Sequence, residues 1–327
     1  MLKRYIRLGD DPLTYKRGVP EPLHYIKPRL QRELYAHRFD GIAYGVQRVL
    51  EELLVSWVRN AILKTGIHKV AFAGGVAMNV KANKLIREMP TVEDFFAMPS
   101  AGDESTSIGA AQWVYAQRMV EAGQEPRIEP LGPLYLGDET SEREIENAMF
   151  DATAMAGGDY AKRTGYYGDD FEKEFDVVHT SHVDNLAADL ILKGEIVARA
   201  RGPMEFGARA LGNRSILCDA TNLRVVREIN MAIKSRDFWM PFAPVVLEAR
   251  MDELLKRSTF VPYMTMAFDT KEAGRHCLTA AMHQADLTVR PQILRADWNP
   301  NYYSILRAYE METGCGGMLN TSFNLHG

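Results

Sequence analysis

The chain has 327 residues, of which 46% are hydrophobic and 25% are charged, and its formal net charge is −4. At about 100–200 residues per domain, this length suggests two globular domains. The acidic balance excludes a general electrostatic attraction to nucleic acid or to an anionic membrane, so any anion site has to be a local patch.

The cysteines and the absence of long apolar runs bear on the compartment. Cys218, Cys277 and Cys315 are widely spaced, odd in number and form no CxxC pair. This pattern predicts neither a disulfide framework nor a zinc site and favours a reducing cytosol. The start, MLKRYIRLGDD, has no apolar core of a signal peptide, and no apolar run approaches the ~20 residues that span a bilayer. We therefore expect a cytoplasmic protein with no membrane partner.

The first part of the chain alternates helical and strand patterns. Residues 1–30 have the mixed charge of a peripheral segment, and from Ile42 apolar residues at helical spacing predict a helix that stops at Gly66. HKVAFAGG then predicts a strand and a turn, followed by a helix in VAMNVKANKLIREM. DFFAMPSAGDES repeats strand and turn before the helical TSIGAAQWVYAQRMVEAG. The order is typical of an α/β fold.

A proline- and glycine-rich stretch at residues 121–140 predicts the domain boundary. We place the first domain at 1–128 and a linker with the second domain at 129–327. SEREIENAM predicts a helix with a capping box of Ser141 and Glu144. GEIVARARG, PFAPVVLEA and VPYMTMAFD predict strands, which makes the second domain α+β. LNTSFNLHG ends the chain in a strand-to-turn transition, where we expect a truncated or disordered terminus.

The turn after the first strand is a candidate anion site. Gly74 and Gly75 precede a helix, where a backbone without Cβ atoms lets a phosphate approach the free N–H groups. Asn79 is placed to orient a polar ligand group. Asp103 follows the second strand and is a candidate metal ligand. A plain tight turn, and a helix-capping role for Asp103, explain the same residues without a ligand.

A second candidate anion site combines a glycine-punctuated arginine run with residues near the C-terminus. Lys234 and Arg236, at i and i+2 of an expected strand, face the same way, as do Ser322 and Asn324. Guanidinium groups suit phosphate and carboxylate, and neutral donors suit ribose or phosphate oxygens. The alternative is a set of solvated surface charges paired with Glu205 and Asp219. The arginines of the run are Arg199, Arg201, Arg209 and Arg214.

Five motifs, in this order and spacing, resemble the NodU/CmcH-type O-carbamoyltransferases. They are GGVAMN, PSAGDESTSIGAA, MEFGARALGNRSIL, IKSRDFWMPFAPVVLE and LNTSFN. The resemblance runs from about Ile42 to the end of the chain. It implies a partial domain of the actin/sugar-kinase-like superfold (ASKHA) followed by a YrdC-like domain.

The resemblance also implies a reaction. In such enzymes the YrdC-like domain converts carbamoyl phosphate and ATP to carbamoyl-adenylate. The kinase-like domain then passes the carbamoyl group to a hydroxyl of a small-molecule acceptor, such as a sugar or an antibiotic, with the help of a divalent metal (iron or magnesium). A homodimer is the assembly we would test first.

The resemblance assigns roles to individual positions. Those matching catalytic, anion-binding positions of the YrdC-like site are Arg209, Lys234 and Arg236. Those matching nucleotide or carbamoyl phosphate contacts are Arg214, Ser322, Asn324, Gly74, Gly75 and Asn79, and Asp103 matches a metal ligand.

Departures from the family pattern leave other interpretations open. The family's metal-binding histidine pair lies in an N-terminal half-domain that is absent here. We therefore expect the chain to be a fragment that does not perform the carbamoyl transfer alone. Pro203 and Met240 stand where arginines are expected. One alternative is a threonylcarbamoyl-transferring enzyme acting on tRNA, which the acidic charge disfavours. Another is a non-catalytic nucleotide-binding remnant.

Overall fold

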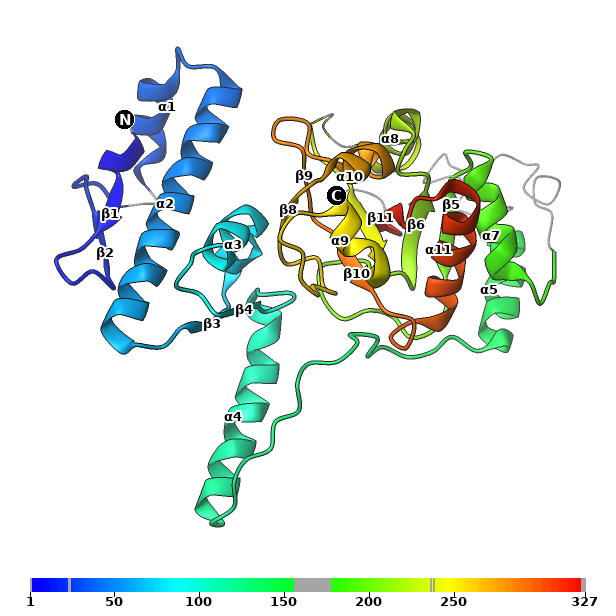
Figure 1. Ribbon diagram of the computed structural model, residues 1–327, viewed down its shortest axis with the longest axis horizontal. Coiled ribbons are helices and arrows are strands. Elements are labelled where there is room, and N and C mark those ends of the chain that lie inside the picture. The colour runs from blue at the N-terminus through cyan, green and yellow to red at the C-terminus, as the bar shows by residue number, and fades with distance from the viewer. Residues whose placement is uncertain (1, 23–24, 156–177, 236, 238, 325–327) are drawn as a thin grey trace. The chain divides into compact units, whose positions relative to one another are not determined.

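The computed structural model describes residues 2–22, 25–155, 178–235, 237 and 239–324. The chain forms two compact units, Met1–Ile128 with Met264–Phe268 and Glu129–Tyr263 with Asp269–Gly327. Both contain helices and strands, so the chain is a mixed α/β protein, as the sequence predicts (Figure 1). Within the described residues, every helix is too short or too polar to cross a bilayer.

The first unit contains two small sheets and four α-helices among its described residues. Its elements are η1 (Leu2–Arg4), β1 (Ile6–Leu8), β2 (Tyr15–Arg17), α1 (Lys27–Leu34), α2 (Phe39–Thr65), β3 (Lys69–Phe72), η3 (Gly75–Met78), α3 (Val80–Arg87), β4 (Asp94–Ala97), η4 (Asp103–Ser105) and α4 (Thr106–Glu121).

The predicted long helix is confirmed as α2. It ends at Thr65, and Gly66 caps it with a left-handed backbone (φ 68°), donating its N–H to the carbonyl of Ile62. The helix buries one side through Leu54, Val58 and Ile62 and packs on α3.

The two predicted strands that flank α3 pair in parallel. Val70 of β3 lies opposite Phe95 of β4, and Phe72 opposite Ala97. The carboxyl ends of neighbouring parallel strands meet at one edge, so the turn after β3 and the turn after β4 follow the same edge of the sheet.

Helix α4 is exposed along its whole length. None of its 16 residues is buried. Its apolar side chains nevertheless include Trp113, Val114 and Val120, which are 66%, 49% and 65% exposed. An apolar helix without a buried face is unusual for a globular domain.

The second unit is built on a five-stranded sheet. Its elements are α5 (Glu142–Met155), α7 (Val183–Leu192), β5 (Val197–Ala200), β6 (Arg214–Cys218), α8 (Leu223–Ile229), the π-helical turn η6 (Asn230–Lys234), β7 (Ala243–Leu247), η7 (Glu248–Arg250), α9 (Met251–Leu254), α10 (Glu272–Cys277), η8 (Thr279–Ala281), β9 (Thr288–Val289), β10 (Gln292–Leu294), α11 (Pro300–Thr313) and β11 (Gly317–Ser322). The short β8 (Phe268–Asp269) spans the division between the units.

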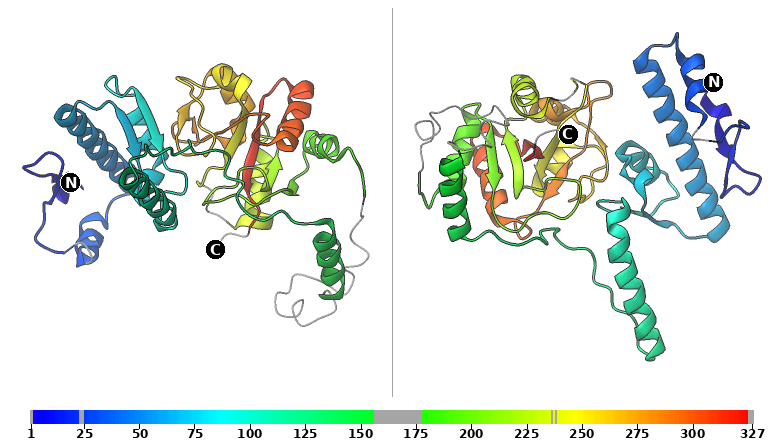
Figure 2. Two further views of the ribbon diagram at one scale, coloured as in Figure 1. Left: turned by 90° about the horizontal axis from the view of Figure 1, so that it is seen from below. Right: turned by 180° about the vertical axis from the view of Figure 1, so that it is seen from behind.

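The strand order of this sheet is β10-β7-β11-β6-β5. β10 runs parallel to β7, and the other neighbours are antiparallel. All five residues of β7 are buried, and α11 and α7 pack together beside the sheet (Figures 1 and 2). In this strand order the central strand is β11, which contributes the C-terminal residues of the candidate site.

The capping box at the start of α5 is confirmed. The backbone N–H of Ser141 donates to Oε2 of Glu144 at 2.8 Å, and the Glu144 N–H donates back to the Ser141 hydroxyl at 3.3 Å. The predicted strands at GEIVARARG and PFAPVVLEA are present as β5 and β7, whereas VPYMTMAFD forms a strand only at its last two residues, in β8.

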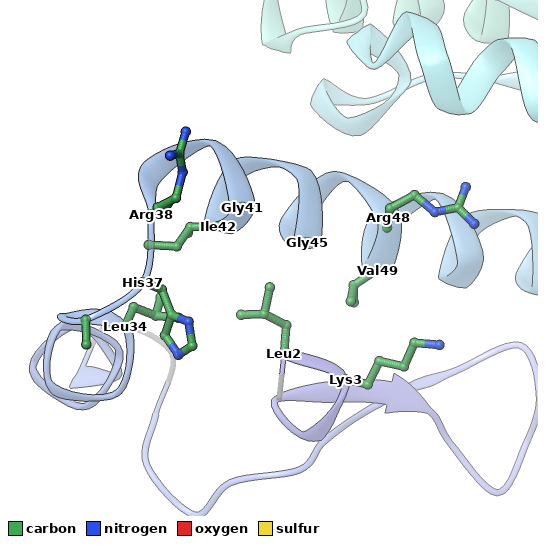
Figure 3. A pocket seen from close by; sticks show the side chains of 11 residues that line it. Leu2, Lys3, Leu34, His37, Arg38, Gly41, Ile42, Gly45, Arg48 and Val49 are labelled. Atoms are coloured by element: carbon green, nitrogen blue, oxygen red, sulfur yellow. The ribbon is translucent and has the colours of Figure 1, made fainter. Parts of the chain in front are cut away.

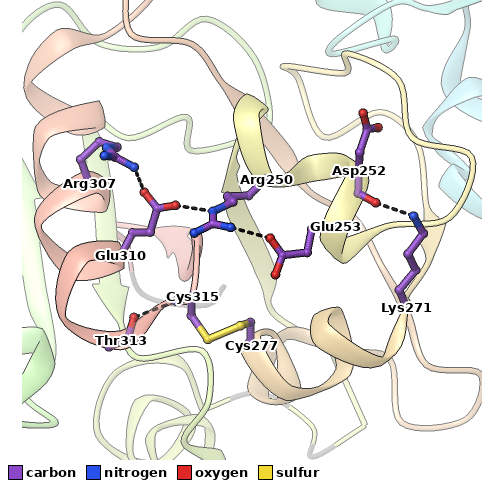
Figure 4. A network of polar contacts seen from close by, with 9 residues as sticks. All are labelled: Arg250, Asp252, Glu253, Lys271, Cys277, Arg307, Glu310, Thr313 and Cys315. Carbon is purple, nitrogen blue, oxygen red and sulfur yellow. Dashed lines mark hydrogen bonds and ion pairs between the residues drawn. A yellow bond between two sulfur atoms is a disulfide. The ribbon is translucent and has the colours of Figure 1, made fainter.

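Two predictions are wrong. The segment around Lys234 is the end of a π-helical turn, followed by Ser235 in a left-handed conformation (φ 47°), instead of a strand. Cys277 and Cys315 form a disulfide (Figure 4). Their Cα atoms are 5.3 Å apart although 38 positions separate them in sequence, because α11 returns the chain to α10. The spacing argument for a reducing compartment therefore does not hold.

Candidate functional site

A glycine-punctuated loop joins β5 to β6 and carries Arg209. Glu205 lies within it, and one carboxylate oxygen, Oε1, accepts hydrogen bonds from three backbone N–H groups. The donors are Leu211 at 2.8 Å, Asn213 at 2.7 Å and Arg214 at 3.1 Å. The loop is thus folded around a carboxylate of its own.

Two of the four arginines of this region serve the fold. Arg199 is 7% exposed and donates to the Gly212 carbonyl and, at 2.9 Å, to Oδ1 of Asn213. Burial lowers the pKa of Arg199 from its usual value. Arg201 forms an ion pair with Asp184 at 2.8 Å. The expectation that the whole run cradles an anion is therefore wrong for the buried Arg199, and it stays a prediction for Arg201 at the surface.

Arg214 is held differently, by neutral hydrogen-bond acceptors. Its guanidinium donates to the carbonyls of Gly202, at 3.0 Å, and of Asn213, at 2.8 Å, and lies 3.4 Å from the Thr140 hydroxyl. Neutral acceptors orient the guanidinium without cancelling its charge. Arg209 lies four residues after Glu205 and is partly exposed.

Lys234 closes onto the end of β11. Its ammonium group donates to the carbonyl and hydroxyl of Ser322, the latter at 3.2 Å, and to the carbonyl and Oδ1 of Asn324, at 2.6 and 3.0 Å. The residue is only 2% exposed. These contacts bring the ammonium group of Lys234 to the strand end together with the Ser322 and Asn324 side chains. Arg236 lies outside the described residues.

Strand β11 connects the arginine loop with the lysine cluster. Ser322 is paired with Ser215 in the sheet, and the N–H of Phe323 donates to the Arg214 carbonyl at 3.0 Å. Further along the strand, Nδ2 of Asn320 donates to the Ala210 carbonyl at 3.1 Å. The backbone segments that carry Arg209, Arg214 and Lys234 therefore adjoin one strand.

In the first unit, the glycine turn after β3 is open. Gly74 has φ +91°, which favours glycine, and a Cβ added at Gly74 or Gly75 would meet no heavy atom within 4 Å. Asn79, in contrast, is engaged: its Oδ1 accepts from the Ala82 N–H at 3.0 Å, and its amide exchanges hydrogen bonds with Gln47. Asn79 caps α3 in this structure.

Asp103 begins the turn η4 after β4 and is exposed. Its neighbour Glu104 accepts a hydrogen bond from Ser100, which is the main cause of the lowered pKa of Glu104. Across the described residues, no three His, Cys, Asp or Glu side chains come together as metal ligands. In this part of the chain Asp103 therefore belongs to no such cluster.

A separate cavity of about 730 Å³ lies between the N-terminal segment and α2 (Figure 3). Its lining is mainly apolar and includes Leu2, Leu34 and Ile42. The cationic side chains at its rim pair with carboxylates on α2: Lys3 with Glu52, Arg38 with Asp40, and Arg48 with Glu51. The cavity therefore offers less positive charge to an anion than its lining residues suggest.

Comparison with protein families decides the affiliation of the chain. A model described as the carbamoyltransferase N-terminus matches residues 23–112, and one described as the carbamoyltransferase C-terminus matches residues 188–327. The chain belongs to the carbamoyltransferase family. The first match contains Gly74, Gly75 and Asp103, and the second contains the arginine loop, Lys234 and β11.

Relatives of this carbamoyltransferase-family chain are longer than it is. Uncharacterized protein MJ1058 of Methanocaldococcus jannaschii is 32% identical over 334 residues, covering 100% of this chain and 51% of that protein. Nodulation protein NolNO of Sinorhizobium fredii is 30% identical over 97% of this chain and 44% of its own length. Nodulation protein U of Bradyrhizobium diazoefficiens is 26% identical over 90% of this chain and 46% of its own length. The chain spans about half the length of the curated relatives it matches.

Sequence reasoning missed the residues that shape the arginine loop. In the sequence Glu205 was considered only as a flanking charge, Asn320 was part of the LNTSFN motif without a role of its own, and Tyr135 and Gln292 were not considered. Tyr135 and Gln292 both donate to the Leu211 carbonyl at 2.8 Å. No local spacing joins residue 135 or 292 to residue 211, so only the fold reveals these contacts.

Proposed function

We propose that the chain is a large part of an ATP-dependent O-carbamoyltransferase and that its second unit makes carbamoyl-adenylate. In the balanced sequence, water first hydrolyses carbamoyl phosphate, breaking its carbamoyl–phosphate linkage and releasing carbamate and orthophosphate. A carbamate oxygen then attacks the α-phosphate of ATP, the P–O bond between the α- and β-phosphates breaks, and carbamoyl-adenylate and pyrophosphate are formed. The observation that carries the proposal is the meeting of the Lys234 cluster and the arginine loop on β11.

The proposed roles follow from charge and position. ATP and carbamoyl phosphate bring several negative charges together, and fixed cations are needed to offset their repulsion. We assign Arg209, Lys234 and Arg236 to this task, with Arg214 as a further phosphate contact. The Arg214 side chain is oriented by neutral carbonyls, which favours this role. Ser322 and Asn324 would supply neutral hydrogen bonds to ribose or phosphate oxygens.

The transfer step is assigned to the first unit, as a partial actin/sugar-kinase-like domain beside a YrdC-like second unit. The open turn at Gly74 and Gly75 gives a nucleotide phosphate room to approach the backbone, with Asn79 shaping the helix start behind it. The acceptor would be a hydroxyl of a small molecule, and the compartment would be the cytoplasm, where both co-substrates are made. A homodimer is the assembly to test.

The described residues do not by themselves provide a complete set of metal ligands around Asp103. Asp103 provides one carboxylate, whereas iron or magnesium needs several ligands. We therefore propose no step through a metal. The exposed apolar side chains of α4 and the half-length match to relatives support the view that more polypeptide completes this unit.

Two other functions make different demands. A tRNA acceptor calls for a basic surface, and the net charge of −4 argues against it. A non-catalytic remnant of a nucleotide-binding enzyme would keep the fold, and it would lose nucleotide binding where its site has decayed. The departures Pro203 and Met240 are its best support, although the Pro203 carbonyl here accepts a hydrogen bond from Asn213 and so helps to hold the loop.

Calorimetric titration of the full chain with ATP tests the proposal. We expect binding that weakens at least about tenfold in Arg209→Ala and in Lys234→Met, each of which removes a charge from the site. Arg224→Ala, on the exposed side of α8, is the matched control and should bind normally. No binding by the unmutated chain would refute the proposed function and favour the remnant.

A further inference from the structure

Most backbone polar groups of residues 210–214 have hydrogen-bond partners within the second unit. Glu205 takes the N–H groups of Leu211, Asn213 and Arg214. The Gly212 N–H donates to the Ser215 hydroxyl at 3.0 Å. A loop whose polar groups have internal partners does not depend on water or ligand for its shape.

The carbonyl groups of this loop are held by side chains from distant parts of the chain. Asn320 donates to the Ala210 carbonyl, and Tyr135 and Gln292 donate to that of Leu211. The Gly212 carbonyl accepts from the buried Arg199. Gln292 and Asn320 are 3% and 1% exposed, so these donors have little freedom to move.

The stem on the other side of Arg209 is fixed as well. The Phe206 N–H donates to the Leu134 carbonyl at 2.7 Å. Arg209 therefore sits on a short span between two anchored points, Phe206 and Ala210. Because the anchors lie three residues before it and one residue after it, the direction of its backbone is limited before any substrate arrives.

Glu205 is a charged partner that bonds to the backbone of three loop positions at once. A carboxylate that accepts several N–H groups makes charge-assisted bonds, which are roughly twice as strong as neutral ones. Its loss would leave three N–H groups without their acceptor in a partly buried place, which is costly.

We infer that Glu205 is a positioning residue that preorganises the loop presenting Arg209 to the anionic substrates. This inference rests on the proposed function for the identity of those substrates. The loop itself is built independently of them, and the site is preformed instead of ordering on binding. Preorganised donors lower the cost of charge stabilisation when the reacting phosphates arrive.

Two measurements on the full chain test this role. Hydrogen exchange compares the amides of Leu211, Asn213 and Arg214 with those of β7, and calorimetry measures ATP affinity. The variants are Glu205→Ala, Glu205→Gln, which keeps an acceptor oxygen without the charge, and the control Glu195→Gln, an exposed glutamate of the same unit.

In Glu205→Ala we expect about tenfold or faster exchange at the three loop amides, unchanged exchange in β7, and about tenfold weaker ATP binding. Glu205→Gln should fall between this variant and the unmutated chain. In an Arg209→Ala background, Glu205→Ala should have little further effect on affinity, since the two act through one group.

Other outcomes overturn the inference. If the loop amides of Glu205→Ala exchange as slowly as those of the unmutated chain, Glu205 does not hold the loop in its conformation. If exchange in β7 is accelerated by the same factor, Glu205 stabilises the whole unit and has no specific role in the loop. If the losses of ATP affinity in Glu205→Ala and Arg209→Ala add up in the double variant, Glu205 does not act through Arg209. If the unmutated chain binds no ATP, the proposed function and the substrate-presenting role both fail, while the exchange data still decide whether Glu205 shapes the loop.

Discussion

Reduction of the Cys277–Cys315 disulfide should destabilise the second unit strongly. The bridge closes a loop of 38 residues. In the chain-entropy model, opening a loop of this length returns about 13 cal/mol/K to the unfolded chain, or about 4 kcal/mol at 25 °C. Both cysteines are buried, 5% and 3% exposed. Since domains are stable by roughly 5–15 kcal/mol, the change is a large share of the total.

Urea unfolding with and without a dithiol measures this effect. We expect the dithiol to lower the free energy of unfolding by about 4 kcal/mol in the unmutated chain, and to have no effect in a Cys277→Ser/Cys315→Ser double variant. Cys218→Ala is the matched control, because Cys218 is buried and free. A urea midpoint of unfolding that is the same with and without the dithiol would contradict the predicted stabilisation by the disulfide. A dithiol response that disappears in Cys218→Ala would contradict it as well.

Two further predictions concern the support of the arginine loop. Gly212→Ala should lower the free energy of unfolding by about 2–4 kcal/mol, because its Cβ would lie 2.3 Å from Cδ1 of the buried Tyr302 and its φ is +119°. Gly314→Ala, with φ +72° and open space around the Cβ, should lower it by only about 1 kcal/mol. Equal losses in urea unfolding would contradict the clash with Tyr302. Burial raises the pKa of Tyr135 to about 12, above its ordinary value of 10.0, so folding favours the neutral phenol that bonds to the Leu211 carbonyl. That contribution is present in full below about pH 10 and is lost as the pH rises toward 12. Tyr135→Phe should show a smaller alkaline decline in unfolding free energy, and an undiminished decline would argue against this assignment.

Local patterns predicted the elements that local physics determines. Helical periodicity from Ile42 and a glycine stop at Gly66 gave α2 nearly to its ends. Short apolar runs before glycine or polar turns predicted β3 and β4, and their parallel pairing places both turns along one edge. In each case neighbours in sequence determine the outcome.

Contacts between distant residues escaped the sequence for physical reasons. The Cys277–Cys315 pair depends on the path of α11, and the role of Arg199 depends on its burial among the loop's own carbonyls. Lys234 was expected on a strand, where it and Arg236 would face the same way, whereas a π-helical turn directs it to Ser322. Its association with the C-terminal motif was proposed from residue type alone. The fold brings its ammonium group to 3.2 Å from the Ser322 hydroxyl.

Pyrophosphate release reports whether the second unit forms carbamoyl-adenylate. We expect the full chain to release pyrophosphate from ATP only when carbamoyl phosphate is present, with the release abolished in Arg209→Ala and intact in Arg224→Ala. Release that does not depend on carbamoyl phosphate, or an Arg209→Ala variant as active as the unmutated chain, would contradict this expectation.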